Sequence, residues 1–88
     1  MKEKRIILRA KNGLHARPAS KLVRIASGFK SNIEIENYTQ KVRVNAKSIL
    51  SMLTLGATYG TELLIQTSGP DEEEALNAVV SFLNDFNE

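Results

Sequence analysis

The stretch Ile33-Glu34-Ile35-Glu36, followed by Val42-Arg43-Val44-Asn45, decides the fold of this chain. In both runs apolar and polar residues alternate with a period of two, which is typical of a strand with one buried face. Asn37-Tyr38-Thr39-Gln40 lies between the runs, so they are predicted to form a hairpin. The connection lacks glycine, and its turn type is therefore not predictable.

Three helices are predicted around this hairpin. The first begins at Ala16, where apolar residues start to recur at steps of three and four, and Gly28 ends it as a C′ residue. The second spans Ser48 to Leu55 and is more apolar than a solvent-facing helix. The third begins near Asp71, where acidic residues suit the positive end of a helix. Its predicted buried stripe consists of Ala75, Ala78, Val79, Phe82, Leu83 and Phe86.

Two more strands, Arg5–Arg9 and Glu62–Thr67, complete the order β-α-β-β-α-β-α. Because the hairpin makes the sheet antiparallel, the helices are expected on one of its faces, in an α+β two-layer sandwich. The 88 residues and the hydrophobic content of 42% suffice for one modest core, so residues 1–88 are expected to form a single domain.

Composition excludes several kinds of function. The chain has no cysteine and one histidine, which excludes disulfides, thiolate chemistry and a structural zinc site of the usual kind, and no cofactor is implied. The apolar run Ile6-Ile7-Leu8 is too short for a signal peptide or a membrane span, so a cytoplasmic protein without membrane insertion is expected. Nucleic-acid binding would rest on the pI of 9.1 alone, because the net charge is only +2 and no strand carries an aromatic pair.

The single histidine, His15, lies where a predicted turn meets the first helix. A lone histidine is most often a surface residue. His15, however, stands at or just before the N-cap, where Ser, Thr, Asp or Asn would stabilise the helix better, and such losses are expected at functional sites. The helix N-terminus attracts anions, and Arg17 adds a guanidinium shaped for phosphate oxygens, although it could equally be a solvated helix residue. The pattern favours a histidine that accepts and releases a phosphoryl group.

A second feature is the segment Asn45–Leu53. Ser48 is well placed as an N-cap, and a serine at a helix start can also carry a phosphate. Ile49, Leu50 and Leu53 would form a docking face if they were exposed beside the His15 loop. The simpler expectation is that at least two of the three belong to the core.

These two segments resemble the motifs of the HPr family, the histidine-containing phosphocarriers of the bacterial phosphoenolpyruvate:sugar phosphotransferase system. Gly13-Leu14-His15-Ala16-Arg17-Pro18-Ala19 is similar to the active-site motif of the family. Asn45-Ala46-Lys47-Ser48-Ile49-Leu50, continuing to Leu55-Gly56, is similar to its regulatory-serine motif. The resemblance implies an open-faced β-sandwich of four antiparallel strands with three helices on one side. The segment Tyr38–Val44 is about two residues longer than is common in the family.

The resemblance also implies partners and roles. His15 would be phosphorylated on Nδ1 by enzyme I, which uses phosphoenolpyruvate, and would pass the group to the IIA domain of a sugar permease. Arg17 would balance phosphate charge, and Ala16 would supply a backbone donor. Ser48 would be the site of HPr kinase/phosphorylase and could promote binding to a transcriptional regulator. The partner surface of this monomeric carrier would comprise Ala16, Ser20, Arg24, Ile49, Leu50 and Leu53. The alternative is a regulatory paralogue, nitrogen-related or a co-repressor, whose phosphorylation signals rather than drives sugar uptake.

Overall fold

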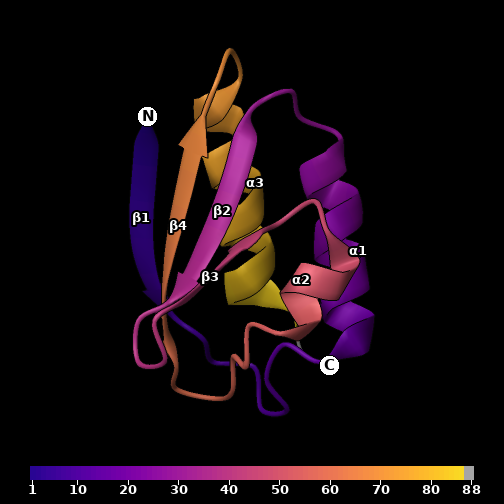
Figure 1. Cartoon of the computed structure of the whole chain (residues 1–88), viewed down its shortest axis with the longest axis vertical. Helices are drawn as coiled ribbons and strands as arrows, with labels where there is room; N and C mark the ends of the chain where they lie inside the picture. Colours follow the sequence, from indigo (N-terminus) through magenta and orange to yellow (C-terminus); the bar gives the residue numbers. More distant parts are fainter. Residues whose placement is uncertain (87–88) are drawn as a thin grey trace.

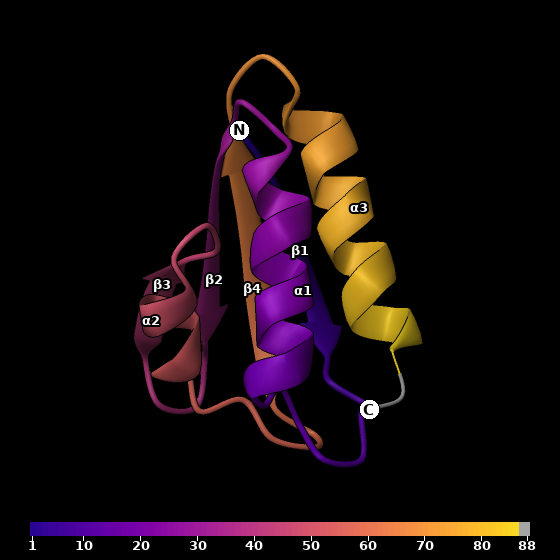
Figure 2. The same ribbon diagram turned by 90° about the vertical axis from the view of Figure 1, so that its right-hand side faces the viewer.

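The protein consists of one antiparallel sheet with its helices packed on one face (Figures 1 and 2). The computed structural model describes residues 1–86. The elements are β1 (Lys2–Ile7), α1 (Ala16–Ser27), β2 (Asn32–Asn37), β3 (Val42–Asn45), α2 (Ile49–Leu53), β4 (Glu62–Ser68) and α3 (Glu72–Asp85). Both the predicted order and the predicted open-faced α+β sandwich are therefore confirmed.

The strand order of the sheet is β1-β4-β2-β3, with every neighbouring pair antiparallel. Ile35 pairs with Val44 on one side and with Ile65 on the other, and all three side chains are buried. Glu34, one residue earlier, is exposed. The period-two alternation therefore sets the register, since a slip of one residue would turn the apolar face to solvent.

The core lies between this sheet and the helices. Its largest side chains are less than 2% exposed and come from every layer: Leu8, Leu22, Ile33, Ile35, Met52, Leu55, Leu63, Ile65, Val79 and Leu83. Burying each such side chain contributes about 1.5–3 kcal/mol of transfer free energy. The α1 and α3 helices cover most of the sheet, and α2 lies beside α1 (Figure 2).

The opposite face of the sheet is polar. Arg43 on β3 donates hydrogen bonds to Glu34 at 2.8 Å and Glu36 at 3.3 Å on β2, and to Gln66 on β4. Gln66 in turn donates to Glu3 on β1 at 2.8 Å. The hydrogen bond to Glu34, aided by the charges of both glutamates, raises the pKa of Arg43. One row of side chains thus connects all the strands on the solvent-facing side.

A hydrogen-bond cluster closes the end of the sheet where α1 leads to β2 and β4 leads to α3 (Figure 1). The Asp71 carboxylate accepts bonds from the N–H groups of Lys30 and Ser31, both at 2.9 Å, and from Ser31 Oγ at 2.6 Å. These donors, the Ser31 hydroxyl above all, lower the pKa of Asp71 from 3.8 to about 2. Gly69, with φ +150°, passes so close to Ser31 that a Cβ there would lie 2.7 Å from it.

The bounds of the first strand and of the second helix differ from the prediction at both ends. The first strand covers Lys2–Ile7 rather than Arg5–Arg9, because it is an edge strand whose backbone pairs with β4 while most of its side chains stay exposed. Such a strand has little apolar patterning to reveal its start. The second helix covers Ile49–Leu53 rather than Ser48–Leu55. Thr54 ends it, with Oγ1 donating to the carbonyl of Ser51 at 2.6 Å.

The helix ends and stripes also differ in detail. Gly28 stops α1, as predicted, but it is the C-cap residue, with φ −77° in the right-handed region, rather than the C′ residue. In α3, Leu76 is buried although it was not predicted, and Ala78, Phe82 and Phe86 are only half-buried. The reason is that α3 turns Ala78, Phe82 and Phe86 toward a groove between α3 and α1 rather than toward the sheet.

The β2–β3 connection is closed by a backbone bond from the N–H of Lys41 to the carbonyl of Asn37, at 2.7 Å. Lys41 has φ +57°, a left-handed conformation that glycine adopts more easily. Within residues 1–86 no helix is long and apolar enough to cross a membrane.

Candidate functional site

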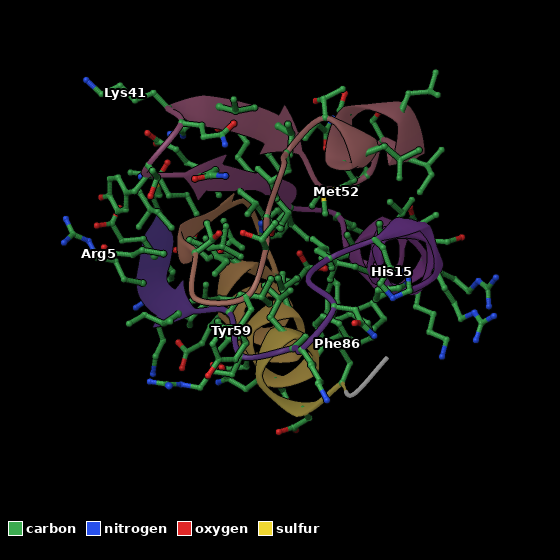
Figure 3. All side chains as sticks on the ribbon, turned by 90° about the horizontal axis from the view of Figure 1, so that it is seen from below. Arg5, His15, Lys41, Met52, Tyr59 and Phe86 are labelled. Carbon is green, nitrogen blue, oxygen red and sulfur yellow. The ribbon has the colours of Figure 1, made fainter. Side chains whose placement is uncertain are left out.

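His15 is the N-cap residue of α1, as predicted. Its backbone is extended, with φ −82° and ψ −171°, and its carbonyl accepts the first helical bond from the N–H of Ala19 at 3.0 Å. The side chain is exposed and makes no capping hydrogen bond. Figure 3 looks onto this end of α1, where the labelled imidazole lies at the start of the helix. The ring is thus open to another molecule while its backbone is held in place.

The backbone before His15 is fixed against a second segment. The N–H of Gly13 donates to Ala10 and the N–H of Leu14 donates to Ala57, both at 3.0 Å. Leu14 itself is buried in the core. Gly13 has φ +71°, and a Cβ at this position would lie 2.7 Å from the Ala57 oxygen and 3.0 Å from the Thr58 Cα. Only glycine fits this close approach, so Gly13 allows the backbone just before His15 to lie against Ala57 and Thr58.

The first turn of α1 is suited to an anion. It contains no acidic residue, and Ala16 and Arg17 are exposed there. Pro18 is buried and contributes no N–H group, so its position in the first turn costs the helix little. A helix N-terminus carries a partial positive charge. An oxyanion attached to His15 would therefore lie at a positive, solvent-accessible end of the helix.

One side of α1 continues the site away from His15. Ala16, Ser20 and Arg24 are all exposed and are spaced by four residues, which places them in one row along the helix. Lys21 and Ile25 border the groove against α3 instead. The predicted partner-binding residues of α1 therefore form a single accessible row.

Ser48 is the N-cap of α2, as predicted, and its Oγ accepts a bond from the N–H of Ser51 at 3.3 Å. It is half-buried. The preceding Lys47 extends its Nζ to the carbonyl of Phe29 at 2.7 Å, and so ties the start of α2 to the segment after α1. Ser48 thus has a capping role whether or not it is modified.

The expectation that at least two of Ile49, Leu50 and Leu53 are core residues was wrong. Their exposed fractions are 38%, 76% and 49%. The residue of α2 that enters the core is Met52, which lies between α2 and α1 in Figure 3. A helix of this length has one side facing the core, and Met52 occupies that side. Ile49, Leu50 and Leu53 form what we call the α2 patch.

The structure brings these features into one region, because α1 and α2 lie side by side (Figure 2). Sequence reasoning missed Ala57 and Thr58, the residues against which Gly13 and Leu14 are held. The glycine at position 13 is the local sequence signal for this close contact, since its backbone has a positive φ in the structure. Among the described residues there is no cluster of three or more His, Cys, Asp or Glu side chains that could hold a metal ion.

Comparison with known proteins supports this geometry. The family model described as "PTS HPr component phosphorylation site" matches residues 2–85. The phosphocarrier protein HPr of Treponema pallidum is 44% identical, with 100% of this chain and 97% of that protein covered. The HPr-like protein Crh of Halalkalibacterium halodurans is 41% identical over 94% of this chain and 96% of its own. The crystal structure of HPr-C-His from Thermoanaerobacter tengcongensis superposes with a TM-score of 0.88 at 43% identity, covering 96% of this chain and 92% of that one.

Proposed function

Because the chain belongs to the HPr family of phosphocarrier proteins of the phosphotransferase system, we propose that His15 is its phosphoryl acceptor. In this proposal, enzyme I donates the group and the IIA domain of a sugar permease receives it. The observation that carries the proposal is the exposed imidazole of His15, which occupies an N-cap position without capping the helix. Because the imidazole makes no capping hydrogen bond, a reaction at one of its nitrogens would not disturb the end of the helix.

The chemistry follows from this position. A ring nitrogen of His15 attacks the phosphorus of the phosphorylated donor, and the new N–P bond forms as the donor's bond to phosphorus breaks. The attached group carries about two negative charges next to a helix N-terminus and the exposed Arg17. Each exposed contact of this kind contributes only about 0.3–1 kcal/mol. Such weak stabilisation suits a carrier, because the group must be transferred again.

Docking of both partners is assigned in this proposal to the α1 row, Ala16, Ser20 and Arg24, together with the α2 patch. The α2 patch is apolar and exposed, and Arg24 adds a positive charge on the neighbouring helix α1. A partner with an apolar site rimmed by acidic groups would match this surface.

Ser48 is proposed as a control point for the same surface. A phosphate on its Oγ would add about two negative charges directly before Ile49 and Leu50. Docking an apolar partner face would then require desolvation of that charge. Phosphorylation of Ser48 is therefore expected to weaken docking and slow phosphorylation of His15.

The test is to incubate the chain with enzyme I and phosphoenolpyruvate and to measure an acid-labile adduct. The wild-type chain is expected to form it, and His15→Ala is expected to form none while keeping its fold, because the His15 side chain makes no capping bond. Arg17→Ala serves as a second variant that retains the acceptor. An absence of adduct on the wild-type chain would overturn the assignment.

The regulatory alternative is favoured by one observation, namely that the Crh relative is nearly as similar to this chain as the HPr relative. The presence of His15 argues for a carrier. Pull-down of partners with His15→Ala and Ser48→Asp distinguishes the two. Phosphorylation of a sugar permease by the wild-type chain, with no regulator bound to Ser48→Asp, would exclude the regulatory reading.

A further inference from the structure

Asn37, the last residue of β2, is a polar side chain buried to 1% exposure that joins two separate segments. Its Oδ1 accepts bonds from the N–H groups of Thr39 at 3.1 Å and Gln40 at 3.3 Å, within the β2–β3 turn. Its Nδ2 donates to the carbonyl of Leu55 at 3.0 Å and lies 3.5 Å from that of Gly56. The amide therefore uses both of its ends, one to shape the turn and one to hold the segment after α2.

That segment supports the His15 loop. Ala57, one residue after Gly56, accepts the N–H of Leu14 at 3.0 Å, and Gly13 packs directly on Ala57. Asn37 is thus connected to His15 through its side-chain bond to Leu55 and then through the backbone, by way of Leu55–Ala57 and Gly13–Leu14.

The β2–β3 turn provides a second contact to the same segment. Gln40 Oε1 lies 3.4 Å from the position that a Cβ of Gly56 would occupy, so the Gln40 side chain lies close to Gly56 while Asn37 holds the neighbouring Leu55.

We propose that Asn37 is a positioning residue for His15, acting through the Leu55–Ala57 segment. This proposal rests on the function proposed above for His15. Removing the Nδ2 donor leaves the buried Leu55 carbonyl without its partner, which costs more than a solvent-exposed bond would. The segment then opens locally, and Gly13 and Leu14 lose their fixed support.

The decisive variant is Asn37→Asp, which has the same shape and keeps an acceptor for Thr39 and Gln40 but loses the donor to Leu55. Asn37→Ser is the milder second variant, in case the carboxylate prevents folding. The matched control is Ser31→Ala, which removes a part-buried hydrogen bond to Asp71 at the opposite end of the sheet (Figure 1). Any effect of lowered global stability alone is then shared by the control.

The first readout is hydrogen exchange of the Leu14 amide, compared among variants at denaturant concentrations that equalise their global stability. We expect this amide to exchange about tenfold faster in the Asn37 variants than in wild type, and no faster in Ser31→Ala. Equal exchange in the Asn37 and Ser31 variants would overturn the proposal.

The second readout is the rate at which enzyme I phosphorylates the chain, as a function of chain concentration. Misplacement of the acceptor lowers the maximal rate about tenfold, while the KM for the chain stays within about twofold because the α2 patch is untouched. A raised KM with an unchanged maximal rate would contradict the proposal. Exchange needs no phosphoryl donor, so a wild-type chain that accepts no phosphate overturns the proposed function, while the exchange measurement still decides the role of Asn37.

Discussion

The N–H of Leu14 donates a 3.0 Å hydrogen bond to the carbonyl of Ala57, and this bond holds the residue before the candidate phosphoacceptor against the loop that leads into β4. Local sequence does not determine the position of His15 by itself. A helix N-terminus and a turn bring the imidazole to the surface, and a distant backbone segment determines where on the surface it stays.

Gly13→Ala is expected to lower the free energy of unfolding by at least about 2 kcal/mol, because a left-handed φ and a clash with Ala57 act together. Urea denaturation measures the change. The control is Gly60→Ala: Gly60 also has a positive φ, +87°, but no atom lies within 4 Å of its Cβ position, so only about 1 kcal/mol is expected. Equal losses of unfolding free energy in the two variants would show that the contact with Ala57 contributes nothing to the effect.

His15→Asn is expected to raise the free energy of unfolding by about 0.5–1 kcal/mol, because asparagine is a strong N-cap and the histidine side chain makes no capping bond. The same variant is expected to accept no phosphoryl group. Chemical denaturation and the phosphorylation assay measure the two effects. Ser48→Ala is the opposite case, since it removes a capping bond that exists and should cost about 0.5–1 kcal/mol. A less stable His15→Asn protein would mean that His15 contributes to folding.

Leu50→Gln is expected to change stability by less than about 0.5 kcal/mol, because the side chain is 76% exposed. If the α2 patch docks partners, the KM for enzyme I rises while the maximal rate is retained. Met52→Ala, on the inward side of the same helix, is expected to cost about 2–5 kcal/mol, because its side chain is 1% exposed. An unchanged KM for Leu50→Gln would remove Leu50 from the proposed docking surface.

Acid is expected to weaken the end of the sheet opposite His15. The pKa of Asp71 is lowered in the folded protein, so its contribution to stability is present above its ordinary value of 3.8 and is lost as the pH falls through about 2. Ser31→Ala removes the largest cause, so the pKa of Asp71 rises toward 3.8, its contribution to stability becomes smaller, and the loss is complete at a higher pH. Carboxyl chemical shifts measure the titration, and unfolding at a series of pH values measures stability. An Asp71 that titrates at 3.8 in the wild-type chain would contradict the cluster.

The parts of the fold that follow a repeating pattern were predictable from sequence. Ile33, Ile35 and Val44 are buried as their alternation indicates, and both predicted N-caps, His15 and Ser48, are confirmed. In these cases the decisive interactions lie within a few residues along the chain.

The errors and omissions depend on contacts between distant segments. The choice of Met52 rather than the α2 patch as the buried side depends on where α1 lies, and burial of Leu76 depends on how α3 is rotated against the sheet. From the sequence, Asn37 cannot be distinguished from an ordinary turn residue, because its hydrogen-bond partner Leu55 is remote along the chain. Pattern reasoning therefore identified the candidate phosphoacceptor, His15, but not the distant segments that support it.

The sheet order β1-β4-β2-β3 has a consequence for how the protein is made. The strand β4 is the last one synthesised, yet it stands between β1 and β2, so a ribosome-bound chain that lacks it can pair only β2 with β3. The loop that supports Leu14 leads directly into this late strand. A nascent chain should therefore carry His15 from early in translation without the finished support around it, and this candidate phosphoacceptor gains that support only once β4 has been synthesised.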